Sequence, residues 1–386
     1  MLSRDWSVPE TDVLGAIHDA CQSDRQAVLA TIVRVEGSAY RRPGTKMLID
    51  SDGDDVGSLT AGCLEDEVRS LATAVFKSGE SRIERFDLSG DDDVWGLGIG
   101  CNGVIDILLE PLTDTFEPAL RAFEDGENGT VITVLDSETE AFTRGDRTYY
   151  HDDAGEFHEL VGTWPDDVLN RLKDPALTLA TAGNAETVTV DILGSAVTLF
   201  CNGIAAPPKL VVFGTGYDAA PVVELARLAG FRVTVVGFRG AGTASDQFPD
   251  ANRVVSSSPA QIRDALELDE RTYAVVMSHN FVDDRLALEE LVQSPVPYIG
   301  LMGPHKRFEE MLEAFADEDR TFTETELSSI YTPIGLDIGG SAPYQIAMSI
   351  VSEVLAVYND RSPDHLRNRD AALHDRTEIV LDKQSQ

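Results

Sequence analysis

Residues 210–229 read LVVFGTGYDAAPVVELARLA, and this stretch decides the fold of the second half of the chain. It opens with an unbroken apolar run, which is typical of a strand buried on both faces of a sheet. Gly214-Thr215-Gly216 then reads as a turn, and a helical pattern begins at Asp218. This order of strand, glycine turn and helix is that of a GxGxxA loop, whose glycines let a pyrophosphate approach the helix N-terminus.

The sequence beyond this stretch alternates between strand-like and helix-like segments. Strands are expected at 232–236, 273–278 and 298–302, and helices at 259–268, 283–292, 306–316 and 342–358. Such alternation predicts a Rossmann-like α/β domain, a doubly wound parallel sheet covered by helices.

Several residues bear on whether this domain holds a nucleotide. Gly237 stands where an acid usually binds the ribose, and Arg239 suits a 2′-phosphate better. His279 follows a strand, at the edge where ligand sites of such sheets open, and Asp337 lies in a glycine-framed loop. A purely architectural domain is the alternative to a binding site. The candidate cofactor-binding residues of this half are Gly214, Gly216, His279 and Asp337.

The first half is organised around residues 57–68, GSLTAGCLEDEV, in which a short strand leads into Gly62 and Cys63. A helix is expected over 64–77. A cysteine just before a helix meets the positive end of its dipole and free N–H donors, which favour a thiolate. The acids of the first helical turn oppose that charge.

A second cysteine with glycine neighbours lies downstream in GLGIGCNG, residues 96–103, where Cys101 follows Gly100. We expect Cys63 and Cys101 to share one pocket and to contact a small molecule that contains sulfur or a metal. Two buried structural thiols are the alternative.

The loop GSAYRRPG, residues 37–44, carries Arg41 and Arg42 between two expected strands. Guanidinium groups bind phosphate and carboxylate in bidentate fashion, so paired arginines on a glycine-framed loop suit an oxyanion. The alternative is a solvated hairpin tip whose arginines pair with surface acids.

The charge balance is strongly acidic. The 386 residues include 67 acids and 31 bases, giving a formal charge of −36. A dispersed acid excess is used by halophiles for solubility, so we expect a high-salt cytoplasm. The same charge argues against nucleic acid and anionic membranes as partners.

The cysteines and the N-terminus indicate a soluble, reducing, cytoplasmic setting. The four cysteines are far apart and show no zinc spacing, and no segment reads as a signal peptide or a membrane span. We expect four regions: an α+β N-terminal domain at 1–112, a β-rich connecting segment at 113–206, the Rossmann-like domain at 207–360 and a polar tail at 361–386. Strands of the connecting segment are expected at 130–135, 147–150, 177–180, 187–192 and 196–200.

The motifs of both halves together resemble the XdhC/CoxI family. In the first half, GSAYRRPGTKML (37–48), GSLTAGCLEDEV (57–68) and GLGIGCNGVIDILLE (96–110) are similar to its N-terminal domain. The second half is similar to its C-terminal domain over 214–239, YIGLMG (298–303) and YTPIGLDIG (331–339), with departures at Tyr217, Gly237 and Phe281.

The resemblance implies an accessory factor for xanthine dehydrogenase and related molybdenum hydroxylases. Such factors bind the molybdenum cofactor, help its sulfuration and deliver it to the apoenzyme. Cys63 and Cys101 match the family's two cysteines, and Arg41 and Arg42 its hairpin arginines. We hypothesise that the thiols contact the metal and the arginines the phosphate.

The expected partners are the hydroxylase apoenzyme, a cysteine desulfurase and a second copy of the chain. In this interpretation the protein is a chaperone and not an enzyme of metabolism. The first rival is an NAD(P)-dependent oxidoreductase that uses the Gly214–Ala219 loop. The second is a sulfurtransferase with Cys63 as the nucleophile.

Overall fold

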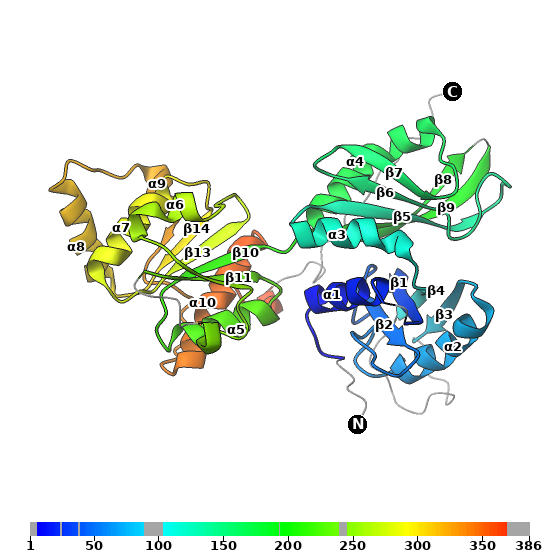
Figure 1. The fold of residues 1–386 in the computed structure, drawn as a ribbon, viewed down its shortest axis with the longest axis horizontal. Helices are drawn as coiled ribbons and strands as arrows, with labels where there is room; N and C mark the ends of the chain where they lie inside the picture. The colour runs from blue at the N-terminus through cyan, green and yellow to red at the C-terminus, as the bar shows by residue number, and fades with distance from the viewer. Residues whose placement is uncertain are drawn as a thin grey trace. The chain divides into compact units, whose positions relative to one another are not determined.

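The computed structural model describes residues 6–23, 25–37, 39–88, 103–192, 194–238 and 245–368. The internal contacts divide the chain between Ala206 and Pro207. We call the part up to Ala206 unit 1 and the part from Pro207 unit 2, and describe each by itself (Figure 1).

Unit 1 contains two antiparallel sheets with helices on their faces. The first sheet has the strand order β2-β1-β4-β3, and the second β7-β6-β5-β9-β8. The elements in chain order are α1 (Glu10–Cys21), β1 (Ala27–Gly37), β2 (Lys46–Asp50), α2 (Glu65–Ser78), β3 (Arg82–Asp87), β4 (Gly103–Pro111), η1 (Asp114–Phe116), α3 (Glu117–Asp125), β5 (Gly129–Ser137), β6 (Arg147–His151), β7 (Glu156–Val161), α4 (Asp166–Ala182), β8 (Ala185–Ile192) and β9 (Ser195–Ile204).

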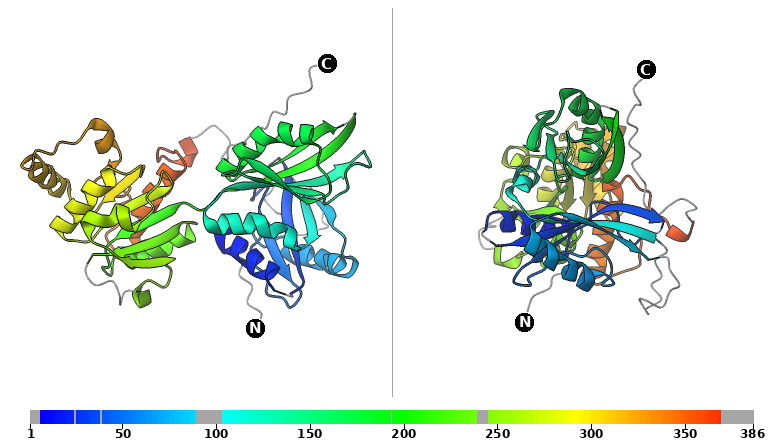
Figure 2. Two further views of the ribbon diagram at one scale, coloured as in Figure 1. Left: turned by 45° about the horizontal axis from the view of Figure 1, so that its top comes forward. Right: turned by 90° about the vertical axis from the view of Figure 1, so that its right-hand side faces the viewer.

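The first sheet is covered on both faces because its central strand β1 is apolar on both sides. Val28, Ala30 and Ile32 pack toward α2, whereas Ala27 and Leu29 pack toward α1 and α3. Successive side chains of a strand point to opposite faces, so one strand serves two cores. The second sheet packs one face on α4 and the other on α3 (Figure 2).

Unit 2 is a six-stranded parallel sheet with the order β12-β11-β10-β13-β14-β15. This is the Rossmann order, with the topological switch between β10 and β13. Its elements are β10 (Lys209–Phe213), α5 (Ala219–Leu228), β11 (Arg232–Gly237), η3 (Ser245–Gln247), β12 (Arg253–Ser256), η4 (Pro259–Gln261), α6 (Ile262–Ala265), β13 (Thr272–Val276), α7 (Phe281–Val292), β14 (Tyr298–Leu301), α8 (His305–Ala316), α9 (Glu324–Ser328), β15 (Ile330–Tyr331), α10 (Pro343–Tyr358) and η5 (Leu366–Asn368).

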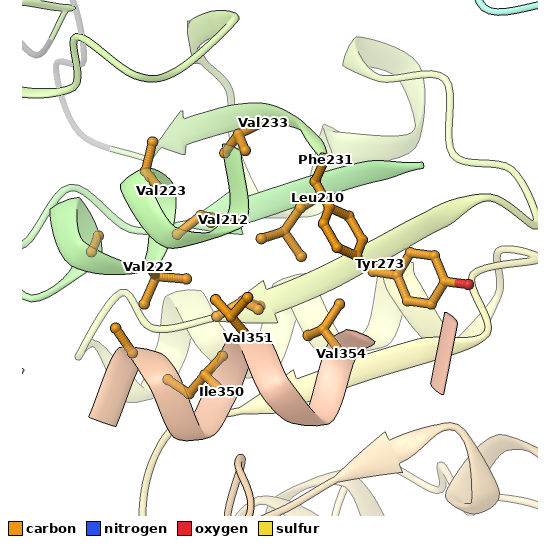
Figure 3. Packing of buried hydrophobic residues seen from close by; sticks show 14 of the residues in the cluster. Leu210, Val212, Val222, Val223, Phe231, Val233, Tyr273, Ile350, Val351 and Val354 are labelled. Carbon is orange, nitrogen blue, oxygen red and sulfur yellow. The ribbon is translucent and has the colours of Figure 1, made fainter. Parts of the chain in front are cut away.

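The two faces of the unit 2 sheet are buried by different helices. Leu210 and Val212 of β10 face α5 and α10, where they meet Val222 and Ile350 (Figure 3). The intervening residues of β10, Val211 and Phe213, face the opposite core with α7 and α8. Burial on both faces explains why β10 is apolar throughout.

The α/β class and the parallel Rossmann-like sheet are confirmed, and two local predictions are wrong. Residues 177–180, expected as a strand, lie inside α4. Residues 56–60, expected as a strand, contribute only an isolated bridge between Val56 and Leu48, and the chain then bends toward Cys63. A short apolar run does not distinguish a strand from one face of a helix.

Candidate functional site

A hollow in unit 1 brings the Arg41 loop and the Cys63 turn together. It contains about 400 Å³ of space, part of it open to solvent. Its lining is mostly apolar and comes from Ile32, Ala39, Tyr40, Arg41, Leu59, Thr60, Ala61, Cys63, Leu88 and Ile105. Arg41 is the single cationic side chain among these lining residues, and Cys63 the single thiol.

A buried carboxylate holds the turn that carries Cys63. Glu65, the first residue of α2, is 1% exposed and folds back under the preceding residues. Its Oε1 accepts the N–H groups of Leu59 (3.2 Å) and Thr60 (2.7 Å). Its Oε2 accepts the N–H of Leu64 (3.2 Å) and the hydroxyl of Thr60 (2.7 Å).

Thr60 links the Glu65 carboxylate to the backbone of Cys63 through hydrogen bonds. Because its hydroxyl donates to Glu65, its lone pairs can accept, and they receive the N–H groups of Cys63 (3.1 Å) and Leu64 (3.3 Å). The N–H groups at residues 59, 60, 63 and 64 are therefore engaged inside the turn. These four N–H groups are therefore not free donors for a Cys63 thiolate.

The Cys63 side chain is exposed and the turn beneath it needs a glycine. Gly62 has φ +104°, a conformation that L side chains rarely adopt, although a Cβ there would meet no atom within 4 Å. Gly62 is thus required by the backbone and not by crowding.

The two arginines of the hairpin loop have different surroundings. Arg41 lines the hollow, with its guanidinium 5.4 Å from the Tyr40 ring centroid and Nη2 donating to Ser58 Oγ at 3.4 Å. Arg42 does not line it; its Nη1 donates to Asn184 Oδ1 (3.2 Å) between α4 and β8. Only one of the paired arginines therefore lies beside Cys63.

Gly100 and Cys101 lie outside the described residues, so their place relative to Cys63 stays a prediction. One residue that flanks their segment does lie at the hollow. Leu88 lines it, and the Leu88 N–H donates to the carbonyl of Gly103 at 2.9 Å.

The thiols of Cys21 and Cys201 are structural. Cys21, at the end of α1, has its Sγ 3.6 Å from the carbonyl oxygen of Thr113, and burial raises its pKa to about 11. Cys201 is buried in β9, where desolvation raises the pKa of its thiol to about 12. Both thiols are protonated at neutral pH and lie in packed surroundings.

In unit 2, the loops after β10 and β13 bring three of the candidate residues together. Gly214 has φ +144°, and a Cβ there would lie 2.5 Å from the Met277 carbonyl oxygen. His279 Nε2 lies 2.8 Å from Asp218 Oδ2, beside Gly216. Asp337, the fourth candidate, is exposed in the loop between β15 and α10.

The loop that carries His279 rests on a buried ion pair. The fully buried carboxylate of Asp284 accepts the Ser278 N–H and hydroxyl. Its other oxygen accepts Arg307 Nη2 at 2.6 Å. His279 itself has φ +59°, which is rare for a residue with a side chain.

Three residues of these sites were not singled out by the sequence: Thr60, Glu65 and Asp218. Glu65 reads in sequence as one of three acids that favour the helix dipole, and its fold-back onto Thr60 has no periodic signature. Within the described ranges, no group of three or more His, Cys, Asp or Glu side chains is arranged to hold a metal ion. None of the helices described here is long and apolar enough to cross a bilayer.

Comparison with known proteins shows that XdhC family patterns match both units. The pattern of the XdhC and CoxI family matches residues 20–87, and that of the XdhC Rossmann domain matches residues 210–354. A protein of Bacillus subtilis described as a probable subunit of xanthine dehydrogenase is 31% identical over 343 residues, covering 87% of this chain and 95% of that protein.

More distant relatives span a similar length. The molybdenum cofactor insertion chaperone PaoD of Escherichia coli is 21% identical over 361 residues, covering 91% of this chain and 92% of its own. The crystal structure of a xanthine dehydrogenase from Bacillus halodurans superposes with a TM-score of 0.71 at 26% identity, covering 92% of this chain and 96% of that one.

Proposed function

The chain belongs to the XdhC and CoxI family, and we propose that it is an accessory protein that binds molybdenum cofactor and delivers it to a xanthine dehydrogenase-type hydroxylase. The insertion-chaperone relative, similar over most of both chains, supports this role. The observation that carries the proposal is the exposed Cys63 thiol, fixed beside an apolar hollow that also contains Arg41.

The donor set of the hollow suits this cargo. A thiolate is a soft ligand that suits molybdenum, and Cys63 is the lining residue that can supply one. The guanidinium of Arg41 suits the cofactor's phosphate, and the apolar walls suit its flat ring system. Arg42, engaged by Asn184, contributes less in this proposal.

Cys101 is proposed as the second thiol of the same site. Leu88, before its segment, lines the hollow, and the Leu88 N–H donates to the carbonyl of Gly103, after the segment. We also propose that the protein takes part in sulfuration, with a cysteine desulfurase as partner, and that it acts as a homodimer. The sulfurtransferase alternative requires Cys63 to receive a sulfur atom from the desulfurase persulfide, which leaves the desulfurase as a thiolate.

Binding of isolated molybdenum cofactor to the purified protein tests the proposal. We expect Cys63→Ser and Cys101→Ser to lose affinity by about tenfold or more, since each removes a soft ligand. Arg41→Gln should lose more affinity than Arg42→Gln. Cys21→Ser is the matched control, because it removes a thiol that does not line the hollow.

Two outcomes would overturn this assignment. Wild-type protein that is folded yet does not bind the cofactor would remove the chaperone role. Equal binding by wild type and Cys63→Ser would remove Cys63 from the site. Mass spectrometry of Cys63 after incubation with a cysteine desulfurase and cysteine separates the sulfurtransferase alternative, which predicts one added sulfur atom.

A further inference from the structure

The glycine loop of unit 2 has the backbone of a dinucleotide site. It follows β10 at the switch between β10 and β13, where ligands bind in sheets of this topology. Gly214 forms its tight turn, where an added Cβ would collide with the carbonyl of Met277, the residue after β13. The loop then closes into α5 with the Ala219 N–H donating to the carbonyl of Gly216 at 3.1 Å.

The second glycine of such a loop has a steric role, because its missing side chain leaves room for the pyrophosphate. In this chain a side chain of the loop itself occupies that room. A Cβ placed at Gly216 would lie 2.5 Å from Asp218 Oδ1. The carboxylate of Asp218 therefore occupies the position that the glycine keeps open.

His279 holds this carboxylate in place. Its Nε2 lies 2.8 Å from Asp218 Oδ2, and its Cδ2 would lie 3.7 Å from the same Gly216 Cβ. The left-handed backbone at His279, supported on one side by Ser278 and Asp284, directs the ring over the loop. On the other side the Asn280 side chain caps α7 through the N–H groups of Val282 and Asp283.

The carboxylate supplies what a phosphate would supply. It places negative charge at the N-terminus of α5, where the helix dipole favours an anion. It also takes up the imidazole that could otherwise bind a ligand oxygen. A pyrophosphate in the same position would meet both steric overlap and like-charge repulsion.

We infer that Asp218 acts as an internal substitute for a ligand phosphate and closes the Gly214–Gly216 loop to dinucleotides. Asp218 is thus a specificity-determining residue that excludes NAD(P) and related cofactors from unit 2. Unit 2 keeps the Rossmann topology, but the Asp218 carboxylate occupies the position where a phosphate would bind. Asp218 and its loop lie in unit 2 alone, so this inference does not rest on the role proposed for Cys63.

Calorimetric titration with ADP and with inorganic pyrophosphate tests the inference on the full chain. We expect no saturation of the wild type up to about 1 mM ligand, and at least about tenfold tighter ADP binding by Asp218→Ser. Serine removes the carboxylate and is well tolerated at a helix N-cap. Asp218→Asn, which retains the shape but not the charge, should show a smaller gain.

The matched control is Glu313→Gln, an exposed acid on α8 whose replacement changes the net charge equally. Circular dichroism and thermal unfolding show that each variant is folded. The inference is overturned if the wild type binds ADP as tightly as Asp218→Ser, or if folded Asp218→Ser gains no affinity. An equal gain in Glu313→Gln would also overturn it, because the effect would then be one of overall charge.

Discussion

The turn before α2 and the turn before α5 each place a carboxylate of the chain at a helix N-terminus, but only the first leaves room for a ligand. Each leads into a helix whose N-terminal N–H groups attract an anion, and each provides its own carboxylate, Glu65 or Asp218. Glu65 lies beneath its turn, 1% exposed, and leaves Cys63 open above the hollow. Asp218 lies over its turn, with 32% of its side chain exposed, and fills the ligand position. The side on which the internal carboxylate lies decides whether such a turn presents a site or closes it.

Removing the buried carboxylate should produce the largest effect. Glu65→Ala leaves the N–H groups of Leu59 and Thr60 and the Thr60 hydroxyl without their acceptor, so we expect unit 1 to lose about 4 kcal/mol of unfolding free energy. Tryptophan fluorescence during urea unfolding reports this loss, because all three tryptophans precede residue 207. Asp66→Ala, an exposed acid in the same helical turn, is the control. A loss no larger than that of the control would break the comparison.

The next effect concerns the support of the unit 2 turn. Arg307→Met leaves the Asp284 carboxylate buried without its cation, so we expect a loss of about 3 kcal/mol in unit 2. Hydrogen exchange followed by mass spectrometry should show faster exchange in peptides that cover 272–292. Lys306→Met, at an exposed neighbouring position, should leave these peptides unchanged. Unchanged exchange in Arg307→Met would show that Asp284 does not need its partner.

A smaller effect is expected from the backbone of the Cys63 turn. Gly62→Ala introduces a side chain at φ +104°, which should cost about 1 to 2 kcal/mol even though the space around it is open. The same urea experiment measures it. Gly15→Ala is the comparison, since Gly15 lies inside α1 with open space around it and Ala favours a helix there. If both variants are equally stable, the turn is more adaptable than its dihedral angle indicates.

The smallest effect on stability should come from Asp218. Its side chain makes no capping hydrogen bond to α5, and its partner His279 is half exposed, so Asp218→Ser should change the unfolding free energy by less than about 1 kcal/mol. Thermal unfolding by circular dichroism measures this. A change as large as that of Glu65→Ala would mean that Asp218 supports its turn as Glu65 does, and the contrast between the two turns would fail.

The sequence predicts the frame of both sites because periodicity and glycine spacing are local signals. The strand–turn–helix at 210–229 and the helix after Cys63 follow from such patterns. The partners that decide the chemistry are not local. Arg42 meets Asn184, which lies 142 residues away in sequence, and no spacing rule predicts that contact.

The wrong prediction at 177–180 has a related cause. These residues read as an apolar run after Pro175, yet α4 continues through that proline, and Leu179 and Ala180 are buried. Packing against the second sheet of unit 1 decides the conformation there, and local preference does not.

The hydrogen bonds that fix the Cys63 turn use the backbone N–H of residue 63 and not its side chain. The side chain at position 63 can therefore be replaced without loss of the hydrogen bonds that hold the turn. Selenocysteine or a spectroscopically labelled thiol could be installed there while Glu65 and Thr60 preserve the turn. For the same reason, a single substitution at position 63 during evolution would change the chemistry of the hollow while the turn stays intact.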